Sequence, residues 1–250
     1  MKRHLKIHER FLGVIDNLTH REFFRHFIQH TRVPAIFVLL LSPILLRVGA
    51  DPEFAETFDL ISPGDIVVEI GSNVGGLTEA LSRTVGLEGH VYAIEPNILA
   101  FHVLRLRMRK ARNVTCVNVG IDQTEGKGLL FMGGPTDKGA SLSTNHRGLR
   151  GYMTEVPLMT LDKLIDALHL NRLSVVLMDA EGYELRILKG GHRTLTDFRP
   201  SFVIELHADV DPLIQQGVVS LATRYMYTTT TVPTSNVSNP VIILTRKNLD

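Results

Sequence analysis

Short, almost continuous apolar runs alternate with amphipathic stretches along the chain from Asp65 onward. The apolar runs are rich in β-branched residues, and the turn signal Ser62-Pro63-Gly64 precedes the first of them. Such runs are typical of buried strands, whereas apolar residues three or four positions apart are typical of helices. The pattern predicts strands over residues 65–70, 90–94, 114–119, 173–178 and 201–206, with helices over residues 77–85, 98–109, 161–168 and 183–195.

Two further pairs of strands are predicted. Residues 128–132 and 152–157 form an inserted pair joined by a loop rich in Gly, Ser and Thr. Residues 225–229 and 241–245 close the chain as an antiparallel pair joined by a polar loop. Because strands that alternate with helices form a mostly parallel sheet covered on both faces, the sequence predicts a Rossmann-like, doubly wound α/β fold. Its sheet has seven strands, is mostly parallel and includes an antiparallel last strand.

The first 50 residues differ from the rest, because they are basic, rich in histidine and carry apolar residues at helical spacing. The apolar run over residues 33–46 is broken by two prolines and is shorter than the roughly 20 residues that cross a bilayer. We expect no secretory signal, because this run starts too far into the chain. We expect residues 1–50 to form a helical extension packed on the domain of residues 51–250 or on a partner. The alternative is a basic amphipathic anchor with peripheral membrane contact through residues 1–46.

Charge balance and cysteine content argue against several classes of protein. Lys and Arg total 27 against 26 Asp and Glu, so the formal net charge is +1, and the chain has no Trp. A dedicated nucleic-acid binder usually has a large basic excess or aromatic residues interleaved with basic ones, so we expect no nucleic-acid partner. Cys116 is the single cysteine, which excludes an internal disulfide and favours a reducing compartment such as the cytoplasm.

A glycine-rich segment, residues 69–76 (EIGSNVGG), joins the first predicted strand to the first predicted helix. Gly71 lets the backbone approach a ligand, and the N–H groups at the start of the helix can bind an anion. The spacing differs from the Gly-x-Gly-x-x-Gly dinucleotide fingerprint, which argues against NAD. Glu95 ends the second strand, 24 positions after Gly71, where an acid can accept hydrogen bonds from two ribose hydroxyls. Together they predict a ribose-containing cofactor, although a tight turn alone would also explain the glycines.

Several segments resemble motifs of known methyltransferases. The first two resemble motifs of class I S-adenosylmethionine-dependent methyltransferases, and the others resemble the FkbM family within that superfamily. The matching segments are residues 69–75, 92–97 (YAIEPN), 160–164 (TLDKL), 178–184 (MDAEGYE), 188–190 (LKG) and 204–207 (IELH). The sequence departs from the FkbM hallmark at Leu177, which replaces the leading Lys.

The resemblance covers about residues 55–227 and implies S-adenosylmethionine as the cofactor. It also implies transfer of the methyl group to a hydroxyl of a small molecule, sugar or glycan. Glu95 would bind the ribose, the Gly75 and Gly76 amides the methionine carboxylate, and Glu69 or the Gly71 carbonyl the amino group. The implied cofactor-binding residues are Glu69, Gly71, Asn73, Gly75, Gly76 and Glu95.

Asp179, Glu205 and His207 follow the ends of two neighbouring predicted strands, where ligands of doubly wound sheets bind. Transfer to an alcohol needs a base that removes the hydroxyl proton. We expect these three side chains to be catalytic and to point into the crevice beyond the sheet. A divalent metal held by the same residues is an alternative that we rank below metal-free base catalysis. The structural alternatives are a helix cap for Asp179 and a surface loop for His207.

The polar loop over residues 133–150 suits a hydroxylated acceptor such as a sugar. The sequence therefore predicts an O-methyltransferase of small molecules, sugars or glycans. Two alternatives stay open: methylation of a nitrogen on a protein or RNA, and a non-catalytic S-adenosylmethionine-binding protein. Leu177 and the unusual N-terminal segment permit the non-catalytic alternative, whereas the acids and histidine at the strand ends favour an enzyme.

The N-terminal segment gives a testable prediction. If residues 1–50 form a helical extension rather than a bilayer span, alkaline carbonate should extract the full-length protein from membrane fractions. Release by salt alone would indicate a surface-bound basic helix, because screening weakens the attraction of basic residues to anionic lipid. Resistance to carbonate would contradict the prediction.

Overall fold

The structure, a computed structural model, describes residues 54, 58–132, 139–142, 152–232 and 239–247. The predicted helical extension over residues 1–50 and its boundary with the domain lie outside the described residues. No helix within the described ranges is long and apolar enough to cross a membrane.

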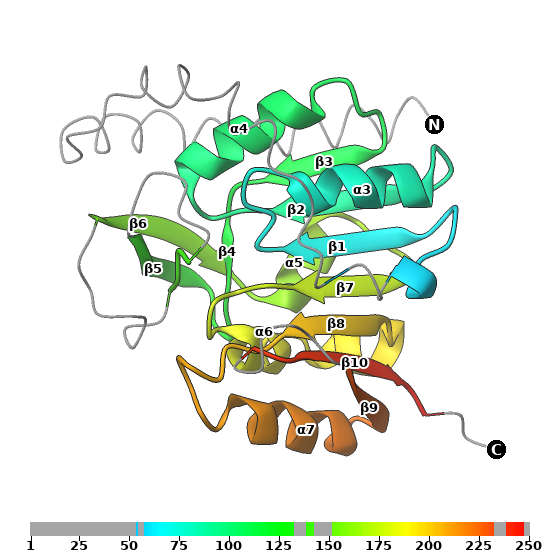
Figure 1. Cartoon of the computed structure of the whole chain (residues 1–250), viewed down its shortest axis with the longest axis vertical. Coiled ribbons are helices and arrows are strands. Elements are labelled where there is room, and N and C mark those ends of the chain that lie inside the picture. The colour runs from blue at the N-terminus through cyan, green and yellow to red at the C-terminus, as the bar shows by residue number, and fades with distance from the viewer. Residues whose placement is uncertain (1–53, 55–57, 133–138, 143–151, 233–238, 248–250) are drawn as a thin grey trace.

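The main sheet has seven strands in the order β3-β2-β1-β7-β8-β10-β9 (Figure 1). The first five of these are parallel to their neighbours, and β10 is antiparallel to both β8 and β9. This arrangement confirms the predicted doubly wound, mostly parallel fold with an antiparallel last strand. The strand bounds are β1 Ile66–Ile70, β2 His90–Ile94, β3 Val114–Val117, β7 Val175–Met178, β8 Ser201–Glu205, β9 Tyr227–Val232 and β10 Val241–Arg246.

Helices cover both faces of this sheet because alternate residues of each strand point to opposite faces. Val67 packs in one apolar cluster with Leu81 of α3, whereas Val68 packs in another with Leu164 of α5 and Val218 of α7. The strands therefore read as nearly continuous apolar runs, as expected when a sheet is buried on both sides. The helix bounds are α3 Gly76–Val85, α4 Ile98–Met108, α5 Leu161–Ala167, α6 Glu184–Lys189 and α7 Ile214–Arg224.

A second sheet of three strands lies beside the carboxyl ends of the parallel strands (Figure 1). It contains β4 (Gly120–Ile121), β5 (Gly126–Met132) and β6 (Tyr152–Met159) in the order β4-β6-β5. The predicted inserted pair is confirmed as β5 and β6, which are antiparallel. The two-residue strand β4 was not predicted, because two residues carry no periodic signal. Of the predicted loop over residues 133–150, only residues 139–142 are described, and Ser141 forms a bridge with Phe131.

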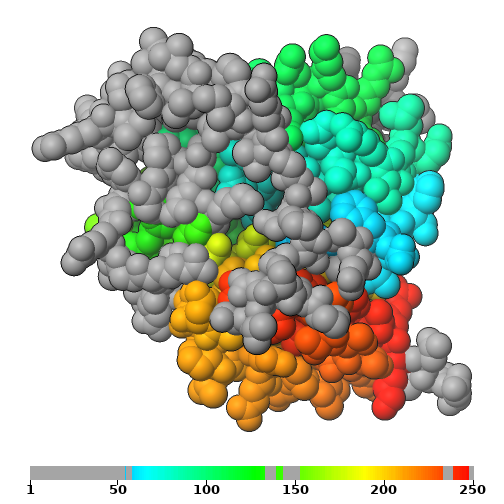
Figure 2. Space-filling model, viewed as in Figure 1, coloured from blue at the N-terminus to red at the C-terminus, as the bar shows by residue number. Residues whose placement is uncertain are grey.

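The prediction was wrong for one helix and missed another. Residues 183–195 do not form one helix: α6 ends at Lys189, and a short π-helix, η2, follows over Thr194–Phe198. Gly190 sits at the break, where a Cβ atom would lie 2.4 Å from the Asp122 carbonyl oxygen. The missed helix is α7, which forms the outer surface next to the last strands (Figure 2).

Gly71 forms the closest contact between the ends of two central strands. Its φ is +89°, and a Cβ atom there would lie 1.9 Å from the carbonyl oxygen of Asp179. The Gly71 N–H donates to the Ile94 carbonyl at 3.0 Å, and the Asp179 N–H donates to the Ile70 carbonyl at 3.0 Å. These backbone contacts fix the ends of β1, β2 and β7 relative to one another.

We expect Gly71→Ala to destabilise the protein much more than Gly64→Ala. Gly64 has nearly the same φ of +90° but no heavy atom within 4 Å of its Cβ position, so it controls for backbone strain alone. Strain should cost each variant about 1–2 kcal/mol, and forced overpacking should cost Gly71→Ala about 1–3 kcal/mol more. Free energies of unfolding from urea titrations test this, and equal losses would contradict the inferred contact.

Candidate active site

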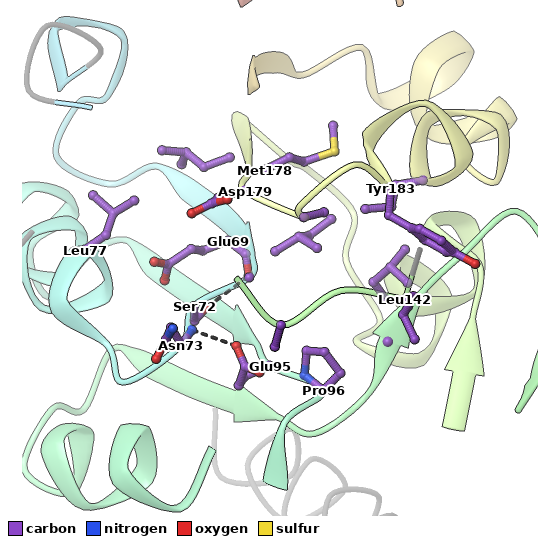
Figure 3. Close-up of a pocket in the computed structure, with 18 of the residues that line it drawn as sticks. Glu69, Ser72, Asn73, Leu77, Glu95, Pro96, Leu142, Met178, Asp179 and Tyr183 are labelled. Atoms are coloured by element: carbon purple, nitrogen blue, oxygen red, sulfur yellow. Dashed lines mark hydrogen bonds between the residues drawn. The ribbon is translucent and has the colours of Figure 1, made fainter. Parts of the chain in front are cut away.

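A pocket opens at the carboxyl ends of β1, β2 and β7 (Figure 3). The turn between β1 and α3 and the segment after β7 form part of its wall. The small sheet adds an apolar part through Ile121 and Leu130, and the segment that bridges to β5 adds Ala140 and Leu142. The residues predicted to bind the cofactor that line this pocket are Glu69, Gly71, Asn73, Gly76 and Glu95. The structure thus brings together groups that are up to 26 positions apart in the sequence.

Glu95 is held in place by backbone donors. Its Oε2 accepts a hydrogen bond from the Asn73 N–H and its Oε1 one from the Asn97 N–H, both at 2.7 Å. The Asn118 side chain donates to the Glu95 carbonyl oxygen, also at 2.7 Å. Burial raises the pKa of Glu95 to about 7, although the two backbone hydrogen bonds act to lower it, and the charge of Glu69 raises it further. The carboxyl group is therefore fixed in position and titrates near neutral pH.

Glu69 is the second buried acid of the pocket. It lies in β1, and its Oε2 accepts a hydrogen bond from the Thr78 hydroxyl at 2.6 Å. Burial raises its pKa to about 7 despite the lowering effect of this hydrogen bond. A positively charged ligand in the pocket would favour the ionised forms of both acids, since an opposite charge nearby stabilises a carboxylate.

The start of α3 is left open for an anion. Its N-cap residue is Gly75, with φ of 82°, and no side chain caps the helix. Gly75 is tightly packed, because a Cβ atom would lie 2.7 Å from Leu104 Cδ1. It does not line the pocket as Gly76 does, so its part is to shape the turn. The uncapped N–H groups and the helix dipole suit a carboxylate.

Five side chains form a cluster beyond β7 and β8, which we call the His207 cluster. His207 Nδ1 lies 2.8 Å from Glu184 Oε1. Its Nε2 lies 3.4 Å from Glu181 Oε2, 3.6 Å from Asp179 Oδ1 and 4.0 Å from Glu205 Oε1. Four carboxyl groups thus surround one imidazole, and the structure brings together the three residues that the sequence predicted as catalytic.

The members of this cluster differ in their access to the pocket. The Asp179 side chain is 38% exposed and lines the pocket, whereas the His207 side chain is 2% exposed and does not line it. Glu205 is also absent from the pocket lining. Of the three residues predicted to be catalytic, Asp179 thus lines the pocket, whereas Glu205 and His207 are buried beside it in the cluster.

The surrounding acids keep the imidazole of His207 protonated. Burial acts to lower its pKa, but the hydrogen bond to Glu184 and the charges of Glu184, Glu181 and Asp179 outweigh burial and raise the pKa to about 10. A protonated imidazole cannot accept a proton. In the chain as it stands, Asp179 is thus better placed than His207 to receive a proton from an acceptor.

Sequence reasoning missed several residues of the site. Thr78 is a buried hydroxyl on α3, and its role emerges only once α3 packs beside Glu69. Glu184 opens α6, where an acid is favoured by the helix dipole, so a structural role explained it equally well before the structure was seen. Leu177, at the altered hallmark position, packs in an apolar cluster with Val67 and Val175 and reaches the pocket wall.

Two solved structures have a fold similar to that of this protein. The methyltransferase FkbM of Methylobacillus flagellatus KT is 16% identical, with a TM-score of 0.51, and the match covers 84% of this chain and 59% of that chain. Fibrillarin from Aeropyrum pernix, solved with natively bound S-adenosyl-L-methionine, is 12% identical, with a TM-score of 0.50 and coverage of 82% and 73%. At these identities the likeness establishes the fold, which is that of Rossmann-like methyltransferases.

The sequence comparison identifies the family. Residues 69–219 match the Methyltransferase FkbM domain, so the chain belongs to the FkbM methyltransferase family. The chain is also 30% identical over 149 residues to the hexuronic acid methyltransferase AglP of Haloferax volcanii. That match covers 59% of this chain and 58% of AglP, so the chain aligns with less than two thirds of its relative.

We expect Glu95→Gln to weaken binding of S-adenosylmethionine about 10- to 150-fold. A hydrogen bond to a charged group contributes about 1.5–3 kcal/mol, and the neutral amide would also place an N–H group against a backbone donor. Isothermal titration calorimetry measures the change. Glu88→Gln, at an exposed acid in the turn before β2, is the matched control and should bind as the wild type does. Equal affinity of the Glu95 variant would remove this residue from the cofactor site.

The same pocket predicts a pH dependence of cofactor affinity. The ionised form of Glu95 has the lone pairs to accept two hydroxyl hydrogen bonds, and its pKa is about 7 in the free protein. Below this pH, binding competes with protonation, so affinity should fall by up to about tenfold per pH unit. It should level off above about pH 8, where the acid is already ionised. Calorimetry across this range checks the sign, and affinity that rises on acidification would contradict it.

Proposed function

We propose that this protein transfers the methyl group of S-adenosylmethionine to a hydroxyl group of a sugar or glycan. The observation that carries the proposal is the shared pocket, into which Glu95 and Asp179 are brought from the ends of different strands (Figure 3). Glu95 suits the hydroxyls of a ribose, and Asp179 suits the hydroxyl of an acceptor. The family membership of the chain supports methyl transfer as the chemistry.

The residues present fit the proposed cofactor. Glu95 would accept the ribose hydroxyls, the uncapped start of α3 would hold the methionine carboxylate, and Glu69 would face the positively charged amino group. The sulfonium of the bound cofactor supplies an already activated methyl group. The protein then has to orient the two reactants, and orientation can contribute about 7–11 kcal/mol to lowering the barrier.

Asp179 would act on the acceptor. As the acceptor oxygen forms its bond to the methyl carbon and the carbon–sulfur bond breaks, the hydroxyl proton has to leave. Asp179 is the member of the His207 cluster that lines the pocket, so its carboxylate would accept this proton. His207 and Glu205 are then positioning residues: His207 Nε2 lies 3.6 Å from Asp179 Oδ1 and 4.0 Å from Glu205 Oε1, and neither residue lines the pocket.

The relative AglP supports a sugar acid as the acceptor, since its name describes a hexuronic acid methyltransferase. A hexuronic acid offers hydroxyl groups and one carboxylate. The four carboxyl groups of the His207 cluster would repel an acceptor carboxylate beside Asp179, which favours a hydroxyl. Treatment of the product with mild alkali distinguishes the two acceptor groups. A methyl ether, formed at a hydroxyl, survives this treatment, whereas a methyl ester, formed at the carboxylate, is hydrolysed.

The alternatives have less support. Methylation of a protein or RNA nitrogen is not favoured by the overall charge, because the formal net charge is only +1. A non-catalytic binding protein would explain Leu177 in place of the hallmark Lys. It would leave the convergence of Asp179, Glu205 and His207 on one point without a purpose.

We expect Asp179→Asn to lower turnover about 10²- to 10⁴-fold, the usual contribution of a general base, while cofactor affinity stays within a few-fold of wild type. Transfer of a labelled methyl group to glucuronic acid derivatives and to extracted glycans measures turnover. Glu88→Gln makes the same change of charge at an exposed acid distant from the pocket and should leave turnover intact. Full activity of the Asp179 variant would refute this assignment, and transfer to none of the acceptors would count against the proposed substrate class.

A further inference from the structure

We propose that Asp179, Glu205 and His207 bind a divalent metal cation of the Mg²⁺ and Mn²⁺ type beside the pocket, on the side that Asp179 lines. The first argument is geometric. One ligand atom from each of these residues lies within 4.8 Å of the other two. All three come from segments at the ends of β7 and β8, which are paired as parallel neighbours.

The separations match those between ligands of one cation. With bond lengths of about 2.1 Å, two ligands of an octahedral cation are about 3 Å apart when adjacent and about 4.2 Å apart when opposite. The distances from His207 Nε2 to Asp179 Oδ1 and Glu205 Oε1 are 3.6 and 4.0 Å, between these two values. Small side-chain rotations would bring the three atoms onto a common centre.

The orientation of the imidazole is the second, independent argument. His207 Nδ1 meets Glu184 Oε1 at 2.8 Å, and that oxygen also accepts hydrogen bonds from the Ala180 and Gly182 N–H groups. Glu184 is therefore fixed, and its hydrogen bond assigns the ring proton to Nδ1. Metal-binding histidines are held in this way by a carboxylate on the nitrogen that does not bind the metal. The arrangement turns Nε2 toward the carboxyl groups of Glu181, Asp179 and Glu205. A cation bound there would replace the proton that Nε2 carries in the free protein.

The charge and access of the cluster also suit a cation. Four carboxyl groups lie within 4.0 Å of one imidazole, so a divalent ion would reduce their mutual repulsion. Asp179 Oδ1 is buried, although the side chain as a whole is 38% exposed and lines the pocket. One oxygen would thus bind the ion while the other stays within reach of the acceptor. Two carboxylates and one imidazole leave coordination positions open for water or a substrate oxygen.

The role of the ion rests on the proposed function, whereas its binding does not. Bound beside the acceptor, the cation would coordinate the hydroxyl oxygen and lower its pKa, so that Asp179 receives the proton more easily. It would also select acceptors with two neighbouring hydroxyl oxygens.

Binding of Mn²⁺ to the full-length protein tests the inference without any acceptor. The electron paramagnetic resonance signal of free Mn²⁺ falls when the ion binds, so a titration gives the affinity. We expect Asp179→Asn and Glu205→Gln each to weaken binding at least tenfold, and Glu88→Gln to bind within about twofold of wild type. Because Asp179 is partly exposed, its variant should fold, and cofactor affinity near the wild-type value verifies that it does.

The outcomes separate this inference from the proposed function. The metal site is overturned if the wild type does not bind Mn²⁺ at millimolar concentration. It is also overturned if Asp179→Asn and Glu205→Gln both bind Mn²⁺ as tightly as the wild type does. Methyl transfer that persists in the presence of a chelator would then leave the proposed function standing on its own. Binding that depends on the cluster supports the site, even if the acceptors tried receive no methyl group.

Discussion

The close approach of Gly71 to the Asp179 carbonyl organises the site. Gly71 approaches the Asp179 carbonyl so closely that no other side chain fits, and hydrogen bonds link the same turn to the end of β2. Three strand ends are thereby held together without any flexible side chain between them. The proposed ribose-binding acid follows one of these ends, and the proposed acceptor-side acid follows another. Their relative position is set by the peptide backbone, which is the most rigid means the fold has of aligning two reactants.

Burial gives the two sides of the pocket opposite electrostatic characters. Glu69 and Glu95 lose water and gain few compensating charges, so burial moves both pKa values to about 7. In the His207 cluster the same loss of water is outweighed by charges, and the pKa of the imidazole is raised to about 10. The first pair is thus responsive to a positive ligand, whereas the cluster already contains both signs of charge. The Glu69–Glu95 pair and the His207 cluster can lie at the same edge of the sheet because their acids come from different strands.

The sequence predicted those parts of the molecule that have a period or a fixed spacing. The five parallel strands are apolar on both faces, and Glu95 stands at the spacing of a ribose-binding acid, so both could be found. The break at Gly190 could not be predicted, because it arises from close contact with the Asp122 carbonyl across the fold.

The burial of His207 could not be predicted from the sequence either. It depends on Glu184, 23 positions away, which is indistinguishable in sequence from an ordinary acid at a helix start. The helix α7, with Ile214, Val218 and Ala222 at four-residue spacing, carried a readable signal that was overlooked.

The small sheet of β4, β5 and β6 has a consequence for how such enzymes diversify. It stands outside the main sheet yet supplies part of the pocket wall through Gly120, Ile121 and Leu130. Its strands pair with one another and not with β1, β2 or β7, so changes in its length or side chains need not disturb the fixed strand ends. Changes there would alter the proposed acceptor side of the pocket and leave the proposed cofactor side in place. In this architecture, a change of substrate is separable from the maintenance of the catalytic frame.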